Sequence, residues 1–130
     1  MNRLVLLAIA VIPVVVSAQP ASVAGKWEIN ANVGGTQTYS ECNFTQKDAD
    51  LTGTCEGDQG PKQITGKVDG KSVSWQLNAQ WEGQTLTVYY KGSLQSSEKI
   101  TGTVDVQPLS VSGEFTATAN TGAVMAWARL

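Results

Sequence analysis

The chain of 130 residues carries 9 Lys and Arg, 11 Asp and Glu and no His, which gives a net charge of −2. Its charges are scattered singly, so no basic stripe is present for a nucleic acid, and a Ser-His-Asp triad is impossible without histidine. Two cysteines are too few for the usual zinc sites, and the acidic residues fall in turns or on polar strand faces. We therefore predict a protein that is not an enzyme, has no catalytic or metal site, uses no cofactor and binds no nucleic acid.

Residues 1–18 have the order of a secretory signal peptide. Arg3 supplies a positive charge, residues 4–16 are apolar except for one proline, and Val16-Ser17-Ala18 suits a signal peptidase. The apolar run is shorter than the roughly 20 residues that cross a membrane as a helix. We expect export to the periplasm or the extracellular space, and no membrane insertion of the mature chain.

The rest of the chain is predicted to form one β-barrel domain over 19–118. A tail follows at 119–130, whose apolar residues would suit only a short helix. Short alternating segments separated by turn residues are typical of a sandwich or a barrel. They predict eight strands at 25–32, 36–46, 51–56, 62–68, 71–80, 84–92, 99–106 and 111–118.

The two cysteines are brought together by the first predicted tight turn inside the domain. A two-residue turn at Asp48-Ala49 places Lys47 opposite Asp50 and Cys42 opposite Cys55. That position is a non-hydrogen-bonded pair, where the Cα atoms are about 4.5 Å apart and a disulfide can form. We predict one disulfide between Cys42 and Cys55.

Two further hairpins follow from dipeptides that accept positive φ. A turn at Asp69-Gly70 would pair Ile64 with Trp75, and a turn at Glu82-Gly83 would pair Ala79 with Leu86.

A short motif recurs four times and puts glycine on the apolar face each time. Inward glycines weaken a flat strand but permit the sharp coiling that closure of a barrel needs. We therefore predict an all-β fold, an eight-stranded antiparallel up-and-down barrel of lipocalin or avidin type, with a β-sandwich as the alternative. The four copies are Leu51 to Cys55, Ile64 to Val68, Ile100 to Val104 and Val111 to Phe115.

The aromatic residues supply the candidate binding site. Trp27 precedes Ile29 by two residues, so both point to the same face of the strand, and Trp27 is predicted to plug one end of the barrel. Trp81 lies beside a turn at a rim. Rings inside an eight-stranded barrel either fill it or contact a ligand. The candidate ligand-binding residues are Trp75, Leu77, Trp81, Val88, Tyr90 and Phe115.

The opening Val23-Ala24-Gly25-Lys26-Trp27-Glu28 resembles the Gly-x-Trp first strand of the calycins, which include lipocalins, fatty-acid-binding proteins and avidins. The repeated Ile-Thr-Gly-x-Val and the Gly-Glu-Phe-Thr-Ala-Thr phrase resemble a lipocalin-like family of short exported bacterial proteins of uncharacterised function. This resemblance implies a small exported barrel. The Thr-Asp-Tyr motif of true lipocalins is missing, and the biotin-contacting residues of avidin have no counterparts here, so biotin is not implied.

Two functions fit these observations, and we favour the first. It is an exported, non-enzymatic binding protein that holds a small apolar or amphipathic ligand in the barrel, which requires unfilled interior volume. The alternative is a protein-interaction module, such as a secreted protease inhibitor or an envelope-associated structural protein. Bacterial inhibitors of secreted metalloproteases share the signal peptide, the early Gly-x-Trp, the barrel and one disulfide. That function predicts a filled core and an exposed aromatic such as Trp81 or Tyr89.

Overall fold

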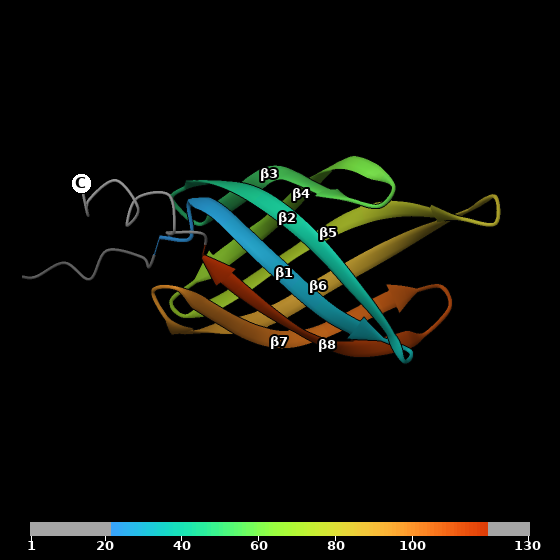
Figure 1. The fold of residues 1–130 in the computed structure, drawn as a ribbon. Coiled ribbons are helices and arrows are strands. Elements are labelled where there is room, and N and C mark those ends of the chain that lie inside the picture. The colour runs from blue at the N-terminus through green and yellow to red at the C-terminus, as the bar shows by residue number, and fades with distance from the viewer. Residues whose placement is uncertain (1–21, 120–130) are drawn as a thin grey trace, which may run out of the picture.

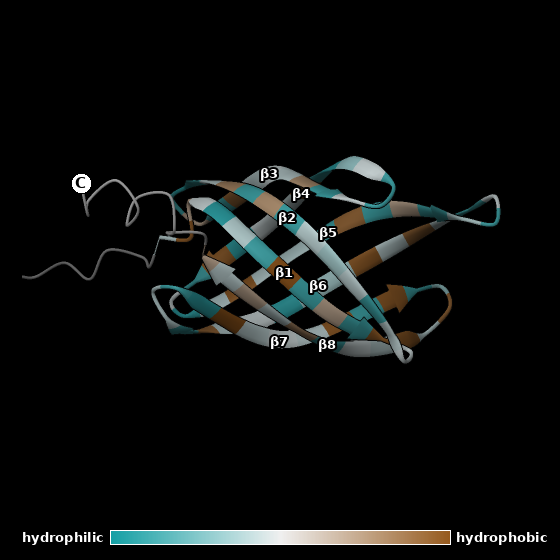
Figure 2. Ribbon diagram, viewed as in Figure 1, coloured by the Kyte–Doolittle hydropathy of each residue, from teal (hydrophilic) through white to brown (hydrophobic). Residues whose placement is uncertain are grey.

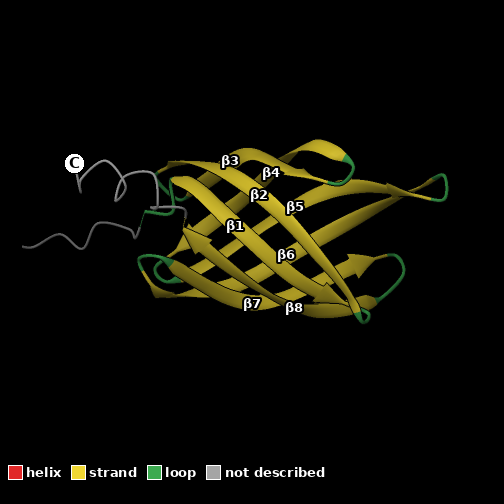
Figure 3. Ribbon diagram, in the orientation of Figure 1, coloured by secondary structure: helices red, strands yellow, loops and turns green. Residues whose placement is uncertain are grey.

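The computed structural model describes residues 22–119, which form a closed eight-stranded antiparallel barrel (Figure 1). Each strand pairs with the next along the chain, and β8 closes the barrel by pairing with β1, so the alternative of a sandwich is not adopted. No helix is present in this part of the chain (Figure 3). The strands are β1 (Gly25–Val33), β2 (Thr36–Lys47), β3 (Asp50–Gly57), β4 (Gly60–Asp69), β5 (Ser72–Trp81), β6 (Gln84–Ser96), β7 (Lys99–Gln107) and β8 (Val111–Ala119).

All eight predicted strands are present. The largest difference is in β6, which continues to Ser96 instead of ending at Gly92, with a shift of register between Leu94 and Ser96 that keeps it paired with β7. The predicted signal peptide and all of the predicted tail except Ala119, the last residue of β8, lie outside the described residues.

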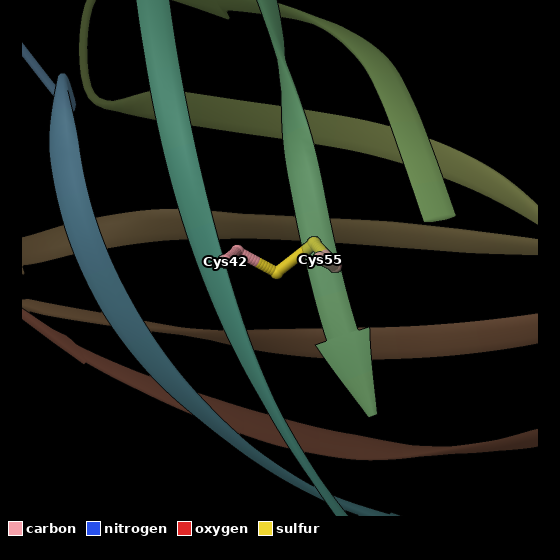
Figure 4. Close-up of a disulfide and its surroundings, with 2 residues drawn as sticks. All are labelled: Cys42 and Cys55. Carbon is pink, nitrogen blue, oxygen red and sulfur yellow. A yellow bond between two sulfur atoms is a disulfide. The ribbon is translucent and has the colours of Figure 1, made fainter. Parts of the chain in front are cut away.

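The predicted disulfide is confirmed. Lys47 lies opposite Asp50, and Cys42 of β2 lies opposite Cys55 of β3, with their sulfur atoms bonded across the two strands (Figure 4). The Glu82-Gly83 turn also gives the predicted register, since Ala79 pairs with Leu86.

The predicted register between β4 and β5 is wrong by two residues. The turn is formed by Gly70 and Lys71, so Asp69 pairs with Ser72, and Trp75 lies opposite Gly66 instead of Ile64. Close packing explains this choice, because a Cβ at Gly66 would lie only 2.8 Å from both the Cα and the Cβ of Trp75. A shift of two residues preserves the alternation of faces, so the predicted inward side chains still point inward.

Hydrophilic and hydrophobic residues alternate along the strands (Figure 2), as a sheet with one buried face requires. The closed half of the barrel is the end where β1 begins and β8 ends, and the open half is the end that carries the turns of the β1–β2, β3–β4, β5–β6 and β7–β8 hairpins (Figure 1). Figure 1 shows the β5–β6 hairpin projecting furthest at the open half.

The closed half is sealed by the segment that precedes β1. Val23 is fully buried, its backbone N–H donates to Oε1 of Gln46 at 2.8 Å, and its carbonyl accepts from Nε1 of Trp27 at 2.9 Å. Trp27 itself is 2% exposed. The prediction that Trp27 plugs one end is confirmed, and its polar nitrogen is satisfied there.

Candidate functional site

Four aromatic rings cross the middle of the barrel and form a floor between its two halves. Trp75 stacks on Tyr90 with ring centroids 5.0 Å apart and planes 11° apart, and Phe115 meets both rings edge-on at 5.2 and 5.3 Å. Phe44 lies 5.0 Å from Trp75 on the other side. Burial raises the pKa of the Tyr90 hydroxyl. The Nε1 of Trp75 is buried without an acceptor among residues 22–119.

Above this floor the inward positions carry smaller side chains, and the interior is not filled. The first of two adjoining hollows, the apolar pocket, has a volume of about 320 Å³, and seven of its nine lining residues are apolar. Its walls come from β1, β2, β5, β6, the end of β7, the β7–β8 connection and the start of β8, so it occupies the mouth of the barrel. It is lined by Val33, Thr38, Trp81, Leu86, Val88, Tyr90, Val106, Leu109 and Val111.

The second hollow, the side pocket, has a volume of about 250 Å³ and shares Thr38, Val88 and Tyr90 with the apolar pocket. Ser40, Leu77, Ala79 and the β3–β4 turn supply most of its remaining wall. Because three residues belong to both, the two hollows are neighbouring parts of one site.

The side pocket exists because strands part in the open half. The β2–β3 ladder ends at the pair Glu41–Glu56, one residue beyond the disulfide, and the β4–β5 ladder ends at Thr65–Gln76. Residues 60–64 of β4 therefore have no ladder to β5, and the β3–β4 hairpin leans away from the body of the barrel (Figure 1).

One side chain bridges this gap. Nε2 of Gln59 donates to the carbonyl of Gln80 at 2.8 Å, and the backbone N–H of Gln80 donates to Oε1 of Gln59 at 3.4 Å. The amide of Gln59 thus takes the place that a residue of a paired strand would occupy, and it bounds the gap at its outer end.

Lys62 is the charged residue that the sequence analysis missed. It alternates with Ile64 and Val68, so it lies at an inward position of β4, and it is the one charged residue at such a position in the described strands. It is half-buried and lines the side pocket. Two ion pairs occur within residues 22–119, Lys26–Glu41 and Lys67–Asp50, and neither involves Lys62. The alternation of β4 carried the signal, since Lys62 precedes the inward Ile64 by two residues.

The predicted site residues divide between pocket and floor. Val88 and Tyr90 line both pockets, Leu77 lines the side pocket, and Trp81 lines the apolar pocket from the rim, where it is 50% exposed. Trp75 and Phe115 are 2% and 3% exposed and line neither pocket. They support Tyr90 from below.

A larger hollow, of about 700 Å³, lies on the outer face across β1, β2, β7 and β8. Polar side chains such as Asn32, Thr103 and Glu114 line it. Ala31 and Phe115 are its apolar residues and the other lining residues are mostly polar, so we place the candidate site inside the barrel, where apolar residues predominate. No three His, Cys, Asp or Glu side chains gather to hold a metal ion within residues 22–119. The same residues include no helix long and apolar enough to cross a membrane.

Comparison with known proteins finds the same fold in designed barrels. No family model and no curated protein matches the chain. Among solved structures, a redesigned β-barrel matches with a TM-score of 0.64 at 15% identity, over 78% of this chain and 96% of that one. The redesigned barrels mFAP1 and mFAP0, each bound to DFHBI, match with TM-scores of 0.55 and 0.56 at 14% and 16% identity. They cover 73% of this chain and 93% and 96% of their own. At such identities the likeness shows the barrel fold alone.

Proposed function

We propose that this chain is an exported, non-enzymatic binding protein that holds a small amphipathic molecule in the open half of its barrel. The observation that carries this proposal is the pair of joined pockets above the aromatic floor. The apolar pocket alone lies at the lower end of the roughly 300–1,000 Å³ typical of ligand sites, and ligand sites typically combine apolar walls with a few polar groups.

The rim of the site gives a second line of support. Trp81 is 50% exposed and Leu109 is 39% exposed, and both line the apolar pocket. Large apolar side chains that gather at the edge of a hollow mark a surface that binds something. The two redesigned barrels bound to DFHBI support the idea that a closed barrel of this size can hold a small molecule.

Export rests on two features of different kinds. The first residues have the order of a signal peptide, and the domain holds a disulfide, which persists in oxidising compartments such as the periplasm or the extracellular space. The resemblance to calycins agrees with both and stays a prediction.

A protein-interaction role is the second candidate, and exposed aromatics on the outer wall favour it. Tyr39 and Tyr89 are 52% and 43% exposed. They lie on β2 and β6, which are not neighbours in the barrel. The two rings are therefore not brought together on adjacent strands. We rank an inhibitor or an envelope-associated structural protein below the ligand-binding function for this reason.

Native mass spectrometry tests the proposal on residues 19–130, exported with the disulfide formed and then incubated with lipid and metabolite extracts. We expect a discrete added mass that is lost on denaturation. Ala79→Phe, which fills the side pocket, should lose that mass, whereas Asn78→Phe places the same ring on the outer face and should keep it. A protein that remains free of any added mass contradicts the ligand-binding function and directs the search to protein partners.

A further inference from the structure

We propose that Lys62 binds the acid group of an anionic amphiphile whose apolar body lies in the apolar pocket. This inference rests on the proposed function and names the class of ligand. It begins from the position of the charge, because Lys62 is the one charged residue on the inward alternation of the described strands. A lysine turned toward an interior without a partner is unfavourable unless something compensates its charge.

No acidic side chain of the described residues compensates that charge. Asp58, in the β3–β4 turn, also lines the side pocket, but it is exposed and makes no ion pair with Lys62. Lys62 pairs across the sheet with Cys55, which is committed to the disulfide. The position is therefore open to an anion from outside the chain.

Hydroxyl groups surround the same hollow. Thr38, Ser40 and Tyr90 line the side pocket together with Lys62. Hydroxyls and an ammonium all donate hydrogen bonds to an acid group, and bonds to charged groups are about twice as strong as neutral ones. The β4–β5 ladder ends before this polar end of the site, and Lys62 is only half-buried there.

The shape of the joined site requires a second, apolar part of the ligand. Thr38, Val88 and Tyr90 belong to both hollows, so a molecule with its acid group at Lys62 extends past them into the apolar pocket. There it meets side chains such as Leu86 and Val106, and each buried methylene contributes about 0.8 kcal/mol. An apolar molecule without charge would leave Lys62 unpaired, and a cation would be repelled.

The test compares three probes of equal chain length: octanoate, octyl sulfate and 1-octanol. Binding to the mature, disulfide-bonded protein is measured by isothermal titration at neutral pH in 0.1 M salt, below the concentrations at which the probes aggregate. We expect wild-type protein to bind the anions roughly tenfold more tightly than the alcohol. Lys62→Gln should abolish that preference and leave 1-octanol binding within about twofold, whereas Lys62→Arg should retain the preference.

Lys91→Gln is the matched control, because Lys91 follows the inward Tyr90 and is exposed on the outer face of the wall. It removes the same charge and should keep the preference for anions. An equal loss of the preference for anions in Lys62→Gln and Lys91→Gln would overturn the role of Lys62, because the preference would then come from the overall charge of the protein. Equal binding of all three probes by the wild-type protein would also overturn the role of Lys62, but it would agree with the proposed ligand-binding function.

If none of the probes binds, both this inference and the proposed function fail. A preference for octanoate over octyl sulfate, or the reverse, would identify the acid group as carboxylate or sulfate.

Discussion

The two halves of the barrel are made of the same strands but differ in how side-chain volumes meet across them. In the closed half and the floor, glycine faces a large ring on the neighbouring strand, as Gly66 faces Trp75 and Gly102 faces Phe115. In the open half, small side chains such as Ala79 line a space that no ring fills. A single alternating pattern therefore builds both a packed core and a cavity, and residue size decides which forms.

The two buried indoles show the same contrast in their polar groups. The N–H of Trp27 in the closed half donates to the carbonyl of Val23. The N–H of Trp75 in the floor has no acceptor among residues 22–119. The buried indole N–H of the closed half is therefore satisfied, whereas that of the floor below the pockets has no hydrogen-bond acceptor among the described residues.

The largest expected effect comes from adding one methyl group against the aromatic floor. A Cβ at Gly66 would overlap the backbone of Ser74 and Trp75, so Gly66→Ala should lower the free energy of unfolding by at least about 3 kcal/mol. Gly57→Ala in the open half is the matched control, since its nearest neighbour would be the carbonyl of Tyr39 at 3.6 Å. It should change stability by no more than about 0.5 kcal/mol. Equal losses of stability in Gly66→Ala and Gly57→Ala, measured by urea unfolding, would show that the two regions are packed alike.

Next in size is the loss of the disulfide at the boundary between the halves. It joins residues 13 apart and lies one pair before β2 and β3 separate. Replacing Cys42 and Cys55 by alanine should lower the free energy of unfolding by about 3 kcal/mol. Reduction of the wild-type protein should give a similar loss. A double variant as stable as wild type would show that the disulfide does not stabilise the barrel where β2 and β3 separate.

The smallest effect concerns the floor at high pH. Burial raises the pKa of Tyr90 above its ordinary value of 10.0, so the folded state favours the neutral phenol. This contribution to stability is fully present below pH 10 and is lost as pH rises through the pKa of the folded state. Wild type should lose more stability than Tyr90→Phe between pH 8 and pH 11, measured by urea unfolding. Since both proteins retain Tyr39 and Tyr89, equal losses would contradict the burial of this hydroxyl.

Much of the fold could be predicted from local patterns. Alternation located all eight strands, and the Asp48-Ala49 and Glu82-Gly83 turns fixed the registers that join Cys42 to Cys55 and Ala79 to Leu86. The same reasoning misplaced the β4–β5 turn, because Asp69-Gly70 and Gly70-Lys71 both accept positive φ at glycine. The packing of Trp75 over Gly66 decides between them, and that contact is not local in the sequence.

The site was less predictable than the fold. Six inward or rim residues were proposed, yet their division into floor and wall depends on where the ladders end. Nothing in β4 or β5 marks Thr65–Gln76 as the last pair, since both strands continue to alternate beyond it. Lys62 could have been found from its parity with Ile64. The bridge from Gln59 to Gln80 could not, because it joins a turn to a strand across the gap.

The division into a packed half and an open half is tested most directly by amide hydrogen exchange along β5 in the ligand-free protein. Ser74 and Gln76 lie within the ladder to β4, whereas Asn78 lies beyond its last pair. We predict that the amide of Asn78 exchanges at least roughly a hundredfold faster than those of Ser74 and Gln76. Equal protection of the three amides would mean that the β4–β5 seam is closed in solution, and it would contradict the side pocket and the site built on it.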